Sequence, residues 1–233
     1  MLSVKALCPV VIYENDDLLV VDKPAGLVCH SSDRATLAGW LREYGIATPR
    51  LVNRLDRETS GLILVAKNER AGKLLGKQVL RREIHKEYLA ICCGELKQDA
   101  GTIDAPIGVT RDSVVYTKRV IDPAGKPSVT EFRVEQRFTG FTLVRLIPRT
   151  GRAHQLRVHM ASIGHPIVGD KIYGPDERLY LEFIQHGVTE EMLEKLLMPR
   201  HALHATCVRL RIPPADFHAP MPEDMLRFIE ERS

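Results

Sequence analysis

The sequence predicts an α+β fold, because its expected strands outnumber its expected helices and the two do not alternate regularly. Regular alternation would instead indicate a doubly wound parallel sheet. The 233 residues are 44% hydrophobic and 27% charged, which is enough apolar material for a sizeable core. Since no repeat or low-complexity tract interrupts the chain, we expect a single domain over residues 1–233.

Strand-forming segments dominate the first part of the chain. Residues 10–13 and 18–22 are mostly apolar, and the polar turn residues 14–17 separate them. A short helix is expected at 36–44, because Leu37, Trp40 and Leu41 recur at helical spacing. A polar loop precedes a dense apolar run, so we expect a buried strand at 62–66 and then a helix at 69–79.

The second part adds three strands and three helices. We expect strands at 87–93, 130–135 and 141–147. A helix is expected at 152–163, with Gly164 as its cap and Pro166 just beyond. Arg152 and Arg157 would border its apolar face on opposite edges. That face would consist of Ala153, Leu156, Met160 and Ile163, and two further helices are expected at 190–197 and 222–231.

The formal net charge of +3 is mildly basic and does not by itself require a nucleic-acid partner. Basic residues nevertheless gather in clusters of the kind that meet phosphates. A solvated charged face explains the same pattern. The clusters are Lys77, Arg81, Arg82 and Lys86, then Lys118 and Arg119, then Arg145, Arg149, Arg152 and Arg157.

The sequence indicates neither a metal site nor a membrane partner. Its five cysteines include an adjacent pair but no CxxC pair, which suits neither a disulfide framework nor zinc. His154 and His159 would point to different sides of a helix, and His201 and His204 lack a third ligand nearby. Residues 1–16 lack the features of a signal peptide, and no apolar stretch approaches the roughly 20 residues that span a bilayer. We therefore expect a cytoplasmic protein.

The most informative segment is NRLDRETSG at 53–61, which places a carboxylate in a polar loop directly before a buried strand. Asp56 lies between Arg54 and Arg57, whose positive charges favour the ionised form of the acid. A loop held by a strand is a common position for a catalytic residue. Taken alone, however, this pattern is more typical of a surface ion pair at a turn.

Five motifs give the chain its resemblance to the RluA family of pseudouridine synthases, over about residues 10–215. Each fragment alone is of moderate specificity, but all five occur in the family's order. They are DKPAGL at 22–27, NRLDRETSGL at 53–62, KEY at 86–88, TGRAHQLRVH and GHPIVGD at 150–159 and 164–170, and RHALHA at 200–205.

The resemblance implies a mixed, largely antiparallel sheet with flanking helices, and an RNA pseudouridine synthase without metal or organic cofactor. Such an enzyme breaks the N1–C1′ bond of a uridine flipped out of the RNA, rotates the uracil and joins C5 to C1′. By resemblance, Asp56 is the nucleophile and Tyr88 lies against the target base, in position to assist a proton transfer. Arg157 would pair with Asp56 and hold it ionised. Attack at C1′, attack at C6 and elimination on the sugar all stay open.

Other polar residues of these motifs are expected to bind the RNA, which would be ribosomal or transfer RNA, and the enzyme is expected to be a monomer. Two features depart from the family pattern. Asn53 stands where the family usually has histidine, and the residues before the first motif are too few for an N-terminal S4 RNA-binding domain, so none is expected. The expected RNA-binding residues are Arg54, Arg57, Thr59, Lys86, Arg152, His154 and Gln155.

Three other functions compete with this interpretation. An inactive RNA-binding protein of the same fold would not need Asp56, Tyr88 and Arg157 together. A metal-dependent nuclease needs a cluster of carboxylate or histidine ligands that the sequence does not offer. A small-molecule isomerase unrelated to RNA explains neither the basic clusters nor the order of the motifs.

Overall fold

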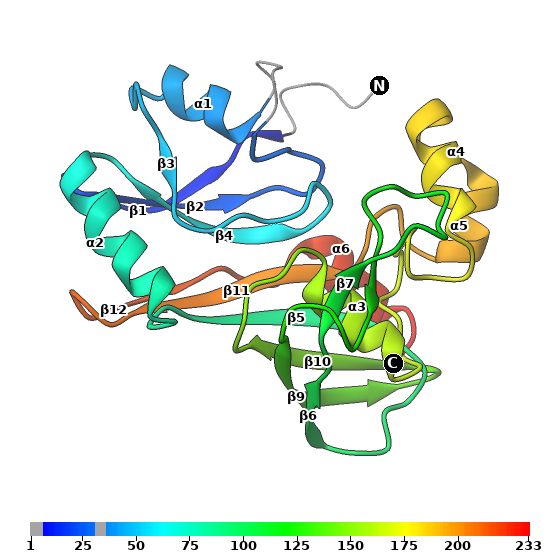
Figure 1. Ribbon diagram of the computed structural model, residues 1–233. Helices are drawn as coiled ribbons and strands as arrows, with labels where there is room; N and C mark the ends of the chain where they lie inside the picture. Colours follow the sequence, from blue (N-terminus) through cyan, green and yellow to red (C-terminus); the bar gives the residue numbers. More distant parts are fainter. Residues whose placement is uncertain (1–6, 31–35) are drawn as a thin grey trace. The chain divides into compact units, whose positions relative to one another are not determined.

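The structure is a computed structural model that describes residues 7–30 and 36–233 (Figure 1). The first six residues of the segment that lacks signal-peptide features lie outside the described residues. The chain forms two compact units, Met1–Glu87 with His204–Met221 and Tyr88–Leu203 with Pro222–Ser233. It passes between them inside two strands, β5 (His85–Cys93) and β11 (Leu203–Leu210). The expectation of a single domain stays a prediction, because one domain can contain two such units.

The first unit is built on a mainly antiparallel sheet with one parallel pair. Its strands are β1 (Val10–Glu14), β2 (Leu18–Lys23), β4 (Ser60–Ala66) and β11 in that order, with β3 (Arg50–Leu51) on β4 and β12 (Ala215–His218) on β11. Only β4 and β11 run parallel. Two helices, α1 (Leu37–Glu43) and α2 (Glu69–Leu80), begin at the side-chain caps Thr36 and Asn68.

Strand β4 is buried along its whole length, as its uninterrupted apolar run predicts for a central strand. One of its faces contributes Leu62 and Leu64 to a core that also contains Leu75 of α2 and Phe217 of β12. Because side chains alternate between the two faces of a strand, the same strand also supports the opposite face.

Gly61 determines how closely β11 approaches β4. Its φ is +113°, and a Cβ added there would lie 2.3 Å from the carbonyl oxygen of Ala205, its partner in the parallel pair. Only glycine tolerates both conditions. One residue earlier, the Ser60 hydroxyl is 2.9 Å from Nδ1 of His204, so the beginning of β4 is tied to β11.

The second unit is also based on an antiparallel sheet, with the strand order β5, β10 (Phe141–Pro148), β9 (Val129–Phe138) and β6 (Ala100–Asp104). A separate pair is formed by β7 (Ile107–Val109) and β8 (Arg119–Ile121). Helices α4 (Arg178–His186) and α5 (Glu190–Leu196) share a small core of Leu179, Met192 and Leu196. The remaining helices are α3 (Gln155–Ser162) and α6 (Glu223–Glu230).

The predicted α+β class with a mostly antiparallel sheet is confirmed, and every strand and helix expected from the sequence is present. One helix needs correction: α3 begins at Gln155, not at Arg152, and it is not amphipathic. Its residues 155–160 are all buried, whereas Ala153 and Ile163 are exposed. The reason is that α3 packs against β9 and β10 and also against β8, so it is covered on more than one side.

Six short strands and one helix had no counterpart in the sequence-based expectations. They are β3, β6, β7, β8, β11, β12 and α4.

Among the described residues, no helix combines the length and apolar character that crossing a bilayer requires.

Candidate active site

Asp56 lies in the loop between β3 and β4, as the sequence predicts. Its carbonyl oxygen accepts a hydrogen bond from the Thr59 N–H at 3.2 Å, which closes a turn. The Asp56 side chain is half-buried, whereas Arg54 and Arg57 are exposed and Thr59 is buried. The loop therefore combines a partly accessible carboxylate with two cations that face solvent, an arrangement suited to an anionic polymer.

Asn53 explains how this loop leaves the sheet. Its side-chain Nδ2 donates to the Leu62 carbonyl at 3.0 Å, and its Oδ1 accepts from the Leu64 N–H at 2.8 Å. The Asn53 side-chain amide thus extends the hydrogen-bonded ladder between β3 and β4, making bonds to β4 that a backbone amide would otherwise make. Its role in this protein is to hold the backbone just before Asp56.

Lys23 connects the DKPAGL motif to the Asp56 loop through hydrogen bonds. The Lys23 side chain is 0% exposed, and its ammonium donates to the carbonyls of Pro24 (2.8 Å), Leu27 (2.9 Å) and Arg57 (3.2 Å). The Gly26 N–H also donates to the Arg57 carbonyl at 2.7 Å. An ammonium has three donors, so these carbonyls match its capacity.

Cys29 packs against the Asp56 loop, and its thiol donates to the Leu55 carbonyl at 3.3 Å. Burial raises the pKa of this thiol, and the nearby charge of Asp56 raises it too, whereas the charges of Lys23 and Arg54 lower it. The thiol is therefore a neutral packing group, and Asp56 is the anionic member of this neighbourhood.

Arg157 and Asp170 form the central ion pair of the second unit. Arg157 Nε and Nη2 donate to the two carboxylate oxygens of Asp170 at 2.6 and 2.8 Å, and the two residues are only 5% and 1% exposed. Although burial raises the pKa of Asp170, the charge and hydrogen bonds of Arg157 hold that pKa well below its usual range. The planar fork fixes the orientation of the Arg157 side chain.

Backbone and aromatic contacts complete this arrangement. Asp170 Oδ1 accepts from the backbone N–H groups of Ile172 and Tyr173 at 3.0 Å. The Arg157 guanidinium lies 5.0 Å from the centre of the Tyr173 ring, and the Tyr173 hydroxyl is 2.8 Å from His154 Nδ1. Gly169, which precedes Asp170, has a φ of +78°. A Cβ added to Gly169 would lie 1.9 Å from the Arg200 carbonyl oxygen, so only glycine fits here.

Tyr88 and Lys86 both come from β5. Tyr88 is 8% exposed and pairs with Leu146 of β10, so its backbone is fixed by the antiparallel ladder. Lys86 is half-buried and burial lowers its pKa. The two side chains lie on the same face of the strand, because they are two residues apart.

Gln155, an expected RNA-binding residue, has a different role. Its Oε1 accepts from the Thr150 hydroxyl (2.8 Å) and the Arg152 N–H (3.0 Å), and its Nε2 donates to the Val129 carbonyl (2.9 Å) and the Thr130 hydroxyl (3.0 Å). These four bonds use the capacity of a primary amide. The buried Gln155 therefore positions the loop before α3, and its expected contact with RNA stays a prediction.

Arg152 and His154 belong to that loop. The half-buried Arg152 directs its Nε to the Pro127 carbonyl at 3.3 Å, and His154 adopts φ +57°. The expectation that Arg152 and Arg157 flank one helix is therefore wrong, because Arg152 precedes α3. By contrast, His159 lies within α3 as a buried packing residue, with Nδ1 at 2.9 Å from the Thr130 hydroxyl.

The predicted site residues divide between the two units. Tyr88, Arg152, His154, Gln155 and Arg157 belong to the second unit. The pairing of Arg157 with Asp56 would join the units, and it stays a prediction. The residues of the first unit are Arg54, Asp56, Arg57, Thr59 and Lys86.

Three residues that shape this site were given no role from the sequence. Lys23 and Asp170 stand inside the quoted motifs DKPAGL and GHPIVGD, and Asn53 appeared there only as a departure from the family pattern. For Lys23 and Asp170, the available signal was that a charged side chain beside an apolar run is seldom buried without a partner.

Comparison with known proteins gives the family. The sequence profile of RNA pseudouridylate synthases matches residues 17–162, which is more than half of the chain. The chain belongs to the RNA pseudouridylate synthase family. It is therefore an isomerase that converts uridine in RNA to pseudouridine, which confirms the predicted activity and the RNA substrate.

Relatives and solved structures agree with this assignment. Ribosomal large subunit pseudouridine synthase D of Escherichia coli K12 is 38% identical, over 94% of this chain and 69% of that protein. The enzyme of the same name from Vibrio cholerae is 39% identical, over 93% and 68%. Human RNA pseudouridylate synthase domain containing 1 superposes with a TM-score of 0.75 at 29% identity, covering 94% of this chain and 84% of that chain.

Proposed function

We propose that this pseudouridine synthase modifies uridine in large-subunit ribosomal RNA and that Asp56 is its nucleophile. The relatives named ribosomal large subunit pseudouridine synthase D favour ribosomal over transfer RNA. The observation that carries the catalytic assignment is the Asp56 loop. Its backbone is held by buried Lys23 and by Asn53, while the carboxylate itself stays partly accessible.

The reaction needs an accessible anion and a target base outside the RNA stack. An ionised Asp56 attacks the flipped nucleotide and divides one difficult displacement into two easier steps. The N1–C1′ bond breaks, the uracil turns, and C5 forms the new bond to C1′. Asp56 is released, C5 loses its proton and N1 gains one, so the enzyme returns to its starting state. The exposed Arg54 and Arg57 bind phosphates beside the target.

Arg157 acts on the same step as a positioning residue. Asp170 fixes its guanidinium, and we propose that this guanidinium pairs with the Asp56 carboxylate. A rigid guanidinium keeps Asp56 ionised and directs its oxygen. Tyr88 lies against the target base.

A complementation experiment tests the substrate and the nucleophile together. Pseudouridines are mapped in ribosomal and transfer RNA from a strain lacking this gene, and the strain is rescued with the wild-type, Asp56→Asn or Glu58→Gln protein. Glu58 is the matched control, because it is also half-buried and lies in the same loop. We expect a large-subunit ribosomal site to be lost, restored by wild type and Glu58→Gln, and not restored by Asp56→Asn.

The two parts of the proposal fail separately. Loss of pseudouridine in transfer RNA only would contradict the substrate and leave Asp56 in place. Rescue by a folded Asp56→Asn protein would contradict the nucleophile and leave the substrate in place.

We also propose that the enzyme works in the cytoplasm as a monomer, and that its chemistry uses no metal or organic cofactor. The isomerisation has no redox change and no group donor, which supports this. Turnover of a short unstructured RNA after dialysis against EDTA, together with sedimentation of the active species, checks these points. A metal requirement on that RNA would contradict the proposal.

A further inference from the structure

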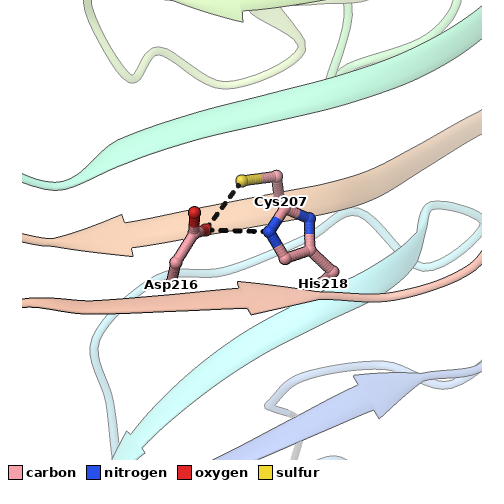
Figure 2. A group of neighbouring side chains, drawn as sticks. All are labelled: Cys207, Asp216 and His218. Carbon is pink, nitrogen blue, oxygen red and sulfur yellow. Dashed lines mark hydrogen bonds and ion pairs between the residues drawn. The ribbon is translucent and has the colours of Figure 1, made fainter.

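The hairpin of β11 and β12 carries polar side chains that the isomerisation does not use. Cys207 pairs directly with His218, and Arg209 pairs with Asp216. Because alternate residues share a face, these four side chains lie on one face of the hairpin. Figure 2 shows three of them, Cys207, Asp216 and His218. The opposite face carries Val208, Leu210 and Phe217, which belong to the apolar core.

Three potential ligand atoms converge on this face. The Cys207 Sγ lies 3.3 Å from Asp216 Oδ1, and His218 Nε2 lies 3.1 Å from the same oxygen. All three lie within 4.8 Å of one another, and no other such group of three occurs among residues 7–30 and 36–233. Sulfur, nitrogen and oxygen ligands of one tetrahedral zinc ion are about 3.3–3.5 Å apart, given bonds near 2.0–2.3 Å.

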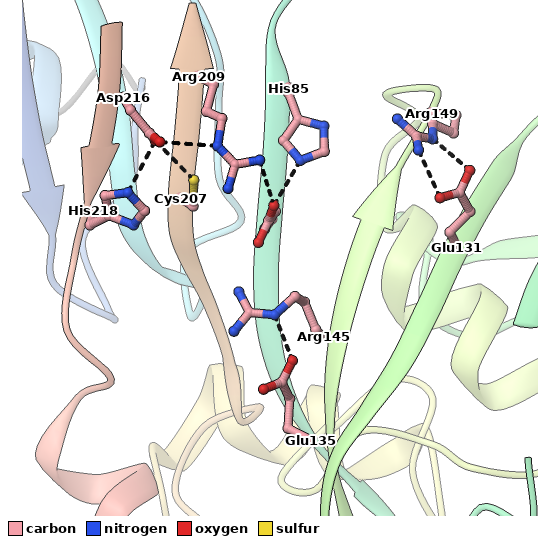
Figure 3. A network of polar contacts seen from close by, with 10 residues as sticks. His85, Glu131, Glu135, Arg145, Arg149, Cys207, Arg209, Asp216 and His218 are labelled. Atoms are coloured by element: carbon pink, nitrogen blue, oxygen red, sulfur yellow. Dashed lines mark hydrogen bonds and ion pairs between the residues drawn. The ribbon is translucent and has the colours of Figure 1, made fainter. Parts of the chain in front are cut away.

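The surrounding charges leave one carboxylate oxygen directed at this centre. Arg209 Nε holds Asp216 Oδ2 at 3.1 Å, while Arg209 Nη1 contacts Glu87 at 2.9 Å (Figure 3). Glu87 also meets His85 Nε2 at 2.8 Å. Such outer contacts orient a ligating carboxylate. Glu87 also offsets the charge of Arg209, so the guanidinium does not strongly oppose a second cation.

The three side chains supply the donor types of a zinc-class site. Cys207 offers sulfur, His218 an imidazole nitrogen and Asp216 a carboxylate oxygen. A metal ion that binds the sulfur displaces the thiol proton.

We propose that Cys207, Asp216 and His218 bind one zinc-class divalent transition metal ion, which links β11 to β12. Thiolate and imidazole ligands select such an ion over magnesium or calcium. Water occupies the fourth position of the tetrahedron. The ion lies on the hairpin of β11 and β12 and is independent of the proposed RNA substrate.

Cobalt(II) is the probe, because a thiolate–cobalt bond gives a charge-transfer absorption band. The full-length protein is titrated with cobalt, and zinc is then added to displace it. We expect one cobalt per chain, a band that is absent in Cys207→Ser, and binding weakened roughly tenfold or more in His218→Gln. Cys8→Ser and His85→Gln are the controls: Cys8 is exposed, and His85 lies in the same polar network outside the ligand group.

A stability measurement completes the test. Zinc should raise the Tm of wild type and of both controls, and should leave that of Cys207→Ser unchanged. If Cys207→Ser does not fold, His218→Gln decides, because the His218 side chain is 64% exposed and its loss leaves the core intact. A missing band in wild type, or a band and a Tm shift that persist in both ligand variants, would overturn the proposal.

Discussion

The two units hold their important side chains in different ways. In the first unit, Lys23 and Asn53 hold the backbone around Asp56, and the carboxylate itself stays half-exposed. In the second unit, the Arg157 side chain is itself buried and clamped by Asp170. A nucleophile has to reach its substrate, so the protein fixes its backbone. An arginine that positions other groups does not move, so the protein fixes its charged end.

The largest effect is expected at Arg157, where fixation is greatest. Arg157→Ala strands the buried Asp170, which costs about 3–5 kcal/mol of the free energy of unfolding, and removes nearly all activity. Arg157→Lys should recover little, because an ammonium lacks the planar fork. Urea unfolding and single-turnover rates measure both effects.

Arg152→Ala is the matched control for this arginine. Its side chain is half-buried and donates to a backbone carbonyl, so the variant should keep near-normal stability and chemistry and bind RNA less well. Normal turnover by Arg157→Ala, with chemistry lost in Arg152→Ala, would reverse the assigned roles.

A second test separates burial from bidentate geometry. Asp170→Asn breaks the buried pair and should cost about 3–5 kcal/mol, whereas Glu131→Gln breaks an exposed pair and should cost about 0–1 kcal/mol. Arg149 meets Glu131 through two bonds of 2.7 Å, so the geometries match (Figure 3). Equal losses in urea unfolding would show that burial does not explain the strength of the Arg157 pair.

Replacing the buried Lys23 should have an intermediate effect, and this effect should fall more on turnover than on RNA binding. Lys23→Met leaves three carbonyls without this donor and should cost about 1–3 kcal/mol of stability. Because the Asp56 loop loosens, kcat should fall more than RNA affinity. Lys77→Met, at an exposed position on α2, should change stability by no more than about 0.5 kcal/mol. A lower affinity with unchanged kcat would contradict the positioning role.

The smallest effect is a dependence on acid pH. The pKa of Asp170 is lowered from its ordinary value of 3.8, so this acid stabilises the fold above that pH and loses its contribution as pH falls further. The difference in free energy of unfolding between wild type and Asp170→Asn should therefore be constant from about pH 5 to 7. In stronger acid this difference should narrow. A gap that widens on acidification would have the wrong sign.

The sequence predicted local features better than long-range partners. Six strands and the loop that carries Asp56 followed from apolar runs and polar residues that neighbouring positions define, whereas six other strands were missed. The burial of α3 did not, because it depends on β8, β9 and β10 covering one helix together. The bond between Arg157 and Asp170 depends on the turn after α3, and the contact of Cys207 with His218 depends on a hairpin register. No spacing rule for metal ligands describes that register.

Ser60 and His204, which tie β4 to its parallel neighbour, are separated by 144 positions. A ribosome adds roughly 5–20 residues per second, so about 7–30 seconds pass between the synthesis of the two strands. During that time β3 and the Asn53 amide cover β4 from Leu62 to Ala66, and the edge at Ser60 and Gly61 waits for β11. The emerging chain therefore presents a short open strand edge, which makes it a natural client for chaperones that act during translation.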